Sequence, residues 1–144
     1  MIVTVYGRLS NFLDKFSMDV ALLIARLAIA PVFWWSGRTK VDGFSVTPEA
    51  ISLFQYEYEL PLISPVLAAH LAALAEHLLP ILLVIGLTTR LGAAGLLAMT
   101  LVIQIFVYPD AWRVHFLWVS VLVFIMARGP GKFSLDQLIF KDKK

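Results

Sequence analysis

The stretch from Val66 to Leu87, VLAAHLAALAEHLLPILLVIGL, constrains the fold of this chain most, because it is apolar over a length that can cross a lipid bilayer. About 20 residues at a rise of about 1.5 Å each span a hydrocarbon core of about 30 Å. The stretch nevertheless contains His70, Glu76 and His77, with Glu76 near its middle. Because lipid cannot solvate a carboxylate, Glu76 must be paired, protonated or directed into an internal cavity.

The composition of the whole chain is that of a membrane protein. Of its 144 residues, 60% are hydrophobic and 15% are charged, and the mean hydropathy is +0.83. Soluble domains have about 45–50% apolar and about 25% charged residues. The apolar runs predict four spans, at about residues 20–37, 66–87, 91–108 and 111–127. We therefore predict an all-α fold, an integral membrane four-helix bundle with short amphipathic interfacial helices, as a single domain over residues 1–144.

Two polar segments flank the first span. Residues 1–18 place apolar side chains at helical spacing, which favours a helix lying on the membrane surface. A cleavable signal peptide is the competing interpretation, because Ala28-Ile29-Ala30 has a small-x-small pattern. That tripeptide lies inside the apolar run, so an uncleaved span is favoured. Residues 38–65 are predicted to cap the outer side of the bundle, with a helix over 48–58 that starts at Thr47-Pro48-Glu49.

The basic residues predict an orientation. If both termini are cytoplasmic, the outer side holds only Arg38, Lys40 and Arg113. The cytoplasmic side then holds eight basic residues, namely Arg8, Lys15, Arg90, Arg128, Lys132, Lys141, Lys143 and Lys144. By the positive-inside rule this asymmetry predicts a multi-pass protein with both termini inside.

Several short motifs, in this order, resemble the DoxX family. They are Arg26 in the first span, Ser36-Gly37-Arg38-Thr39-Lys40 at its exit, Glu76 followed by the run 83–90 (LVIGLTTR), and the closing run 129–136 (GPGKFSLD). The resemblance covers about residues 20–137 and implies a small four-helix protein of the bacterial inner membrane. Relatives include the DoxD-type subunit of thiosulfate:quinone oxidoreductase, so the resemblance also implies a redox and quinone association. His77 and Pro80 depart from the small residues expected after the glutamate.

Three intramembrane polar residues, Arg26, Glu76 and His77, are candidates for a structural or functional role. Arg26 and Lys40 are fourteen residues apart, with Phe33 halfway, so the three share one helical face. Counting depth at about 1.5 Å per residue predicts a buried ion pair between Arg26 and Glu76.

The same depth count predicts a pocket in the outer half of the bundle. It brings polar groups from all four spans to one level, next to the capping segment with its Phe54, Tyr56 and Tyr58. The candidate pocket residues are Trp34, Lys40, His70, Gln104 and His115. Apolar walls with a few hydrogen-bonding groups suit a quinone headgroup. The alternative is that these are ordinary bundle contacts, with the tryptophan a lipid anchor and Gln104 in an interhelical hydrogen bond.

Other chemistries receive less support from the sequence. The chain has no cysteine, which removes thiolate nucleophiles and iron–sulfur ligation within it, and no nucleotide loop or metalloprotease motif occurs. We predict no metal site, leave haem as a less favoured cofactor than quinone, and expect no nucleic-acid partner, because the basic residues form no patch. Two functions stay open: a subunit or scaffold of a membrane redox system that contacts quinone, or a quinone- or haem-binding oxidoreductase component acting itself. A small transporter is a weaker option. The partners expected are the bilayer, a membrane or peripheral redox protein, and a second copy of the chain.

Overall fold

The computed structural model describes residues 17–140, and its helices form an antiparallel bundle. The long helices are α2 (Met18–Arg38), α4 (Pro65–Ile85), α5 (Thr89–Val102) and α6 (Trp112–Arg128). A π-helical turn, η2 (Ile103–Val107), extends α5, and a 3₁₀ turn, η3 (Pro109–Ala111), leads into α6. With these extensions the described part of the chain has four helices long and apolar enough to cross a membrane. The prediction of an all-α, four-helix membrane bundle is confirmed.

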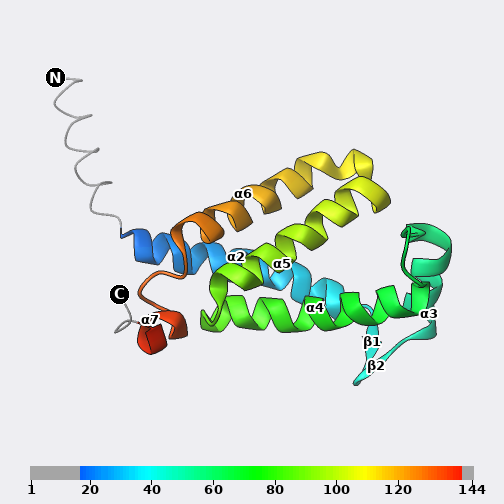
Figure 1. The fold of residues 1–144 in the computed structure, drawn as a ribbon, viewed down its shortest axis with the longest axis horizontal. Helices are drawn as coiled ribbons and strands as arrows, with labels where there is room; N and C mark the ends of the chain where they lie inside the picture. Colours follow the sequence, from blue (N-terminus) through cyan, green and yellow to red (C-terminus); the bar gives the residue numbers. More distant parts are fainter. Residues whose placement is uncertain (1–16, 141–144) are drawn as a thin grey trace.

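The bundle has two different ends (Figure 1). The start of α2, the α4–α5 turn and a short helix, α7 (Leu135–Phe140), lie at one end, which we call the α7 end. At the other, the hairpin end, strands β1 (Val41–Asp42) and β2 (Ser45–Val46) form an antiparallel pair. The interfacial helix predicted for residues 1–18 lies almost wholly outside the described residues.

The helix boundaries follow from local capping chemistry. The side chain of Ser64 accepts a hydrogen bond from the Leu67 amide, and Pro65 occupies the first turn of α4, where its missing N–H costs nothing. Gly86 ends α4 in the left-handed conformation (φ +72°), which glycine adopts without a steric penalty.

The capping segment is built as the sequence predicts. Helix α3 (Pro48–Leu53) is capped by the Thr47 hydroxyl and continues as a π-helical turn, η1 (Phe54–Tyr58). Together they form the helix expected over residues 48–58. Phe54 packs against Ala68 and Ala69 near the start of α4, which holds the segment over the hairpin end of the bundle.

The core lies where all four long helices meet. It contains buried side chains from each of them: Ile29, Ala30, Phe33, Leu83, Ala93, Leu96, Leu122 and Ile125. Toward the hairpin end, α4 diverges from the α5–α6 pair (Figure 1). The candidate site described below lies in this wider half.

Candidate functional site

A buried ion pair between Lys40 and Glu76 forms the polar centre of the hairpin end. Lys40 Nζ lies 2.8 Å from Glu76 Oε2, and the two residues are 4% and 2% exposed. Lys40 Nζ also donates to the carbonyl and hydroxyl oxygens of Ser36, at 3.2 and 3.1 Å, and the Ser36 hydroxyl donates to Glu76 Oε1 at 3.2 Å. All three ammonium hydrogens and both carboxylate oxygens therefore have partners, which is the condition for burying such a pair.

The predicted ion pair between Arg26 and Glu76 is wrong, and the register of the helices explains why. A Cβ placed on Gly37 would lie 2.9 Å from Glu76 Cβ, so Glu76 is level with Gly37. Gly37 comes eleven positions after Arg26, about 16 Å along the helix. The side chains of a helix also lean toward its N-terminus, so Arg26 leans away from Glu76. Lys40 lies in the turn after α2, and its Nζ reaches back to the Ser36 carbonyl and to Glu76.

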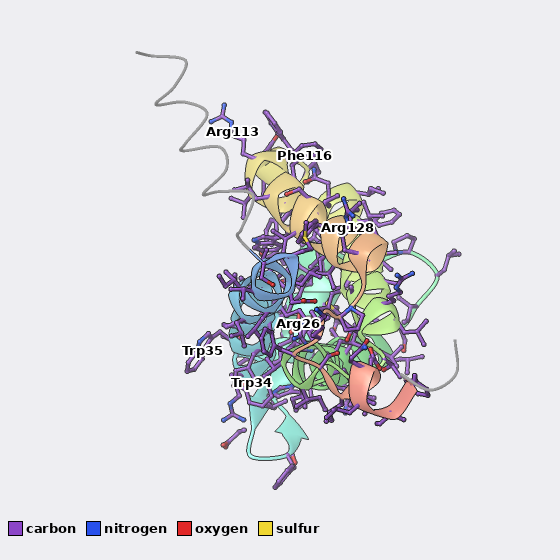
Figure 2. All side chains as sticks on the ribbon, turned by 90° about the vertical axis from the view of Figure 1, so that its left-hand side faces the viewer. Arg26, Trp34, Trp35, Arg113, Phe116 and Arg128 are labelled. Atoms are coloured by element: carbon purple, nitrogen blue, oxygen red, sulfur yellow. The ribbon has the colours of Figure 1, made fainter. Side chains whose placement is uncertain are left out.

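Arg26 instead ties the C-terminal segment to the bundle. Its guanidinium donates to the Leu83 carbonyl at 3.2 Å and to the Phe133 carbonyl, while Nε has no hydrogen-bond partner among the described residues. The residue is fully buried, and Figure 2, which views the bundle from the α7 end, shows it within the bundle. It therefore links α2 to α4 and to the segment after α6, away from the Lys40–Glu76 pair.

A cavity of about 370 Å³ adjoins the Lys40–Glu76 pair, and we call it the hairpin-end cavity. Its walls are mostly apolar and come from α2, η1, α4, α5, η2 and α6. Residues from each of these elements line it: Val32, Phe33, Phe54, Leu71, Ala75, Met99, Val102, Val107 and Trp118. Polar side chains reach it from Ser36, Lys40, Glu76, Tyr58, Tyr108 and His115.

His115 is part of a hydrogen-bond chain that fixes its tautomer. The Gln104 amide donates from Nε2 to the Pro109 carbonyl at 2.6 Å, which leaves Oε1 to accept from His115 Nδ1 at 2.7 Å. His115 Nδ1 therefore carries the proton, and in the neutral ring Nε2 is an acceptor. The interhelical hydrogen bond predicted for Gln104 is confirmed.

Two tyrosines close the outer rim of the cavity. Their rings meet edge to face, with centroids 5.8 Å apart for Tyr58 and Tyr108, and the Tyr108 hydroxyl donates to Glu57 Oε1 at 2.6 Å. Burial raises the pKa of the Tyr58 phenol, so this hydroxyl stays protonated and can act as a hydrogen-bond donor at neutral pH. Tyr56, expected beside the pocket with Phe54 and Tyr58, is instead 74% exposed.

The structure brings together only part of the predicted pocket. Lys40 and His115 line the cavity, and Gln104 supports His115 from behind. Trp34 lies on another side of α2, where its ring meets that of His77 at 5.0 Å and lines a separate apolar cavity of about 380 Å³. His70 is exposed, and its Nδ1 bonds to the Val66 carbonyl.

Ser36 and Tyr108 line the cavity but were not among the predicted pocket residues. Ser36 lies four residues before Lys40, so helical spacing alone places both on one face and could have identified it. Tyr108 could not have been found this way, because it follows the π-helical turn η2, which shifts its direction. No three histidine, aspartate or glutamate side chains gather closely enough within residues 17–140 to hold a metal ion.

Comparison with known proteins agrees with this architecture. A family model for DoxX matches residues 21–109, which include Ser36, Lys40 and Glu76. An uncharacterised protein of Haemophilus influenzae is 30% identical over 130 residues, which cover 85% of each of the two chains. No solved structure matches the chain significantly. The family model covers α2 to α5, which is more than half of the length of this chain. The chain therefore belongs to the DoxX family of membrane proteins.

Proposed function

We propose that the protein is an integral membrane subunit of a redox system and binds a quinone headgroup in the hairpin-end cavity. The observation that carries the proposal is the cavity itself, whose volume lies within the range of about 300–1,000 Å³ typical of ligand sites. It combines apolar walls with a few fixed polar groups at membrane depth.

The polar groups of the cavity suit the two redox forms of a quinone. The oxygens of the oxidised ring accept hydrogen bonds, and the Tyr58 hydroxyl is a donor at the cavity rim. The reduced ring has two O–H donors, and His115 Nε2 is an acceptor whose tautomer the Gln104 side chain fixes. Lys40 and Glu76 are fully paired with each other and with Ser36, so we assign them to holding the cavity in shape.

The electron-transfer partner is proposed to be another protein. The DoxX family has among its relatives the DoxD-type subunit of thiosulfate:quinone oxidoreductase, which supports this role, with the described helices providing the membrane-embedded quinone site. We place the protein in the bacterial inner membrane with the hairpin end outside, as its basic residues predict.

A titration with a short-chain ubiquinone analogue tests the proposal. The purified chain in mild detergent is titrated with decylubiquinone, and quenching of tryptophan fluorescence reports binding, because Trp118 lines the cavity. Tyr58→Phe and His115→Leu each remove one hydrogen-bonding group, worth about 0.5–1.5 kcal/mol, so the Kd should rise about two- to tenfold. Gln104→Leu should have a similar effect, because without the Gln104 oxygen the proton of His115 is no longer held on Nδ1.

His70→Leu is the matched control, since it makes the same chemical change at an exposed histidine outside the cavity. Its Kd should equal that of the parent protein. Absence of saturable binding by the parent, or equal losses in His70→Leu and His115→Leu, would rule out this site and leave the chain as a scaffold without a quinone.

A further inference from the structure

A polar cavity of about 620 Å³ lies at the α7 end of the bundle. It is formed by the starts of α2 and α5, the end of α6, the segment that follows α6, and α7. Nine residues line it: Asp19, Arg90, Arg128, Pro130, Gly131, Lys132, Asp136, Gln137 and Phe140. None of them lines the hairpin-end cavity, so this site is independent of the proposed quinone site.

The two carboxylates of this cavity are already engaged. Asp136 accepts hydrogen bonds from the Thr88 and Thr89 amides, at 2.6 and 2.9 Å. Asp19 accepts from the Lys132 amide at 2.9 Å and lies 3.4 Å from Lys132 Nζ. Neither carboxylate forms an ion pair with an arginine of residues 17–140.

Two arginines, Arg90 and Arg128, line the cavity. The Arg90 guanidinium lies against Gly129, where a Cβ would come within 3.2 Å of its Nε, and Arg128 is the residue before that glycine. Neither Arg90 nor Arg128 is within ion-pair distance of an acidic side chain among residues 17–140. Both side chains are exposed, and Figure 2 shows Arg128 at the face of the molecule that the cavity occupies.

An apolar surface beside the cavity places it at the depth of lipid headgroups. Helix α7 and Phe133, two residues before it, expose large apolar side chains. Phe133 is 56% exposed, and in α7 Leu138 is 75%, Ile139 55% and Phe140 48% exposed. A short helix with such a face lies in the membrane interface with its apolar side toward the acyl chains. The neighbouring arginines are then level with the phosphate groups.

We propose that the α7-end cavity binds the headgroup of an anionic phospholipid, with Arg90 and Arg128 as the phosphate ligands. A guanidinium presents two parallel N–H donors that match two oxygens of a phosphate. Lys132 lies beside them but is paired with Asp19, so the two arginines are the phosphate ligands, and basic pockets between membrane helices are suited to such headgroups. Free inorganic phosphate shares this chemistry but lacks the acyl chains that the α7 surface would contact.

Titrations of the full-length purified chain distinguish these ligands. Dioctanoyl phosphatidylglycerol, dioctanoyl phosphatidylcholine and sodium phosphate are each titrated into the protein in uncharged detergent, with calorimetry giving the Kd. We expect saturable binding of phosphatidylglycerol only. Arg90→Gln and Arg128→Gln should each raise its Kd at least about fivefold, the effect of one basic residue at an anionic membrane surface.

Arg113→Gln is the matched control, because Arg113 is an exposed arginine at the other end of α6 that stacks on Trp112. Its Kd for phosphatidylglycerol should be unchanged. Arg90→Lys keeps the charge but removes the bidentate guanidinium donor, so the Kd should rise less than in Arg90→Gln. Equal binding of both lipids, phosphate binding as tightly as phosphatidylglycerol, or an equal loss in Arg113→Gln would overturn the proposal.

Discussion

At the scale of single residues, the Lys40–Glu76 pair is the most consequential feature of the bundle. Each charge alone would be costly in a site that excludes water, and each is neutralised by the other at 2.8 Å. Ser36 completes the set by bonding to both, so no hydrogen-bonding group of the pair is left unsatisfied. The pair also joins the segment that follows α2 to the middle of α4, beside the cavity.

Breaking this pair should destabilise the protein more than removing it. Glu76→Gln or Lys40→Met leaves one buried charge without its partner, which typically costs about 3–5 kcal/mol. The double variant leaves no uncompensated charge, so its loss should be smaller than that of either single variant. Denaturant titration of the purified protein measures the free energies of unfolding for all three variants.

The exposed pair between Lys132 and Asp19 provides the comparison. Its side chains are 77% and 24% exposed, so Lys132→Met should cost less than about 1 kcal/mol. If Glu76→Gln and Lys40→Met are as mild as Lys132→Met, the buried pair does not stabilise the fold.

The sequence predicted which residues are buried in this region better than it predicted their partners. Helical spacing placed Arg26, Phe33 and Lys40 on one face, and all three are buried. A depth count from the ends of the spans could not reveal that Glu76 is level with Gly37, because that register is set by packing between α2 and α4. The partner of Glu76 therefore had to come from the structure.

At the scale of elements, the start of α5 depends on a residue almost fifty positions away. Thr88 adopts a left-handed conformation (φ +46°) and its side chain makes no capping hydrogen bond. The carboxylate of Asp136 takes over this function by accepting from the Thr88 and Thr89 amides. The Asp136 amide also donates to the Gly86 carbonyl at 2.8 Å, so both the side chain and the backbone of Asp136 bind α7 to the α4–α5 turn.

Asp136→Ala should loosen this turn. Removing a capping carboxylate costs about 0.5–2 kcal/mol, and here two amides lose their acceptor. Hydrogen–deuterium exchange should therefore be faster at residues 88–91 than in the parent protein. Asp110→Ala is the control, because Asp110 is exposed and its side chain makes no hydrogen bond to the described residues. Exchange that is equally slow in Asp136→Ala would show that the cap is dispensable.

Hydrophobic runs and capping motifs predicted the long helices and the helix at residues 48–58, because those signals are local. The two π-helical turns were not predictable in the same way, since each occurs where a helix meets its neighbours at the cavity. Residues 135–140 form α7, which follows the four predicted spans and exposes apolar side chains. The long-range contacts of residues 133–140 with Arg26 and with the α4–α5 turn have no signature in the local sequence.

At the scale of the whole molecule, the two ends of the bundle have different chemistry. The hairpin end has an apolar cavity next to a neutralised ion pair, whereas the α7 end has a polar cavity with two unpaired arginines among the described residues. A quinone and an anionic headgroup would thus enter at opposite membrane surfaces. The distribution of the basic residues predicts which end faces the cytoplasm, namely the α7 end.

Cysteine labelling can determine that orientation directly, because the chain has no cysteine of its own. Phe44→Cys places a thiol in the exposed turn of the hairpin, and Lys132→Cys places one at the exposed α7 end. With the α7 end in the cytoplasm, a membrane-impermeant maleimide applied to intact bacterial cells should label only Phe44→Cys. Both variants should be labelled once the membrane is permeabilised, which controls for thiol accessibility. Labelling of Lys132→Cys alone would reverse the predicted orientation, and labelling of both in intact cells would contradict a membrane-spanning arrangement that separates the two ends.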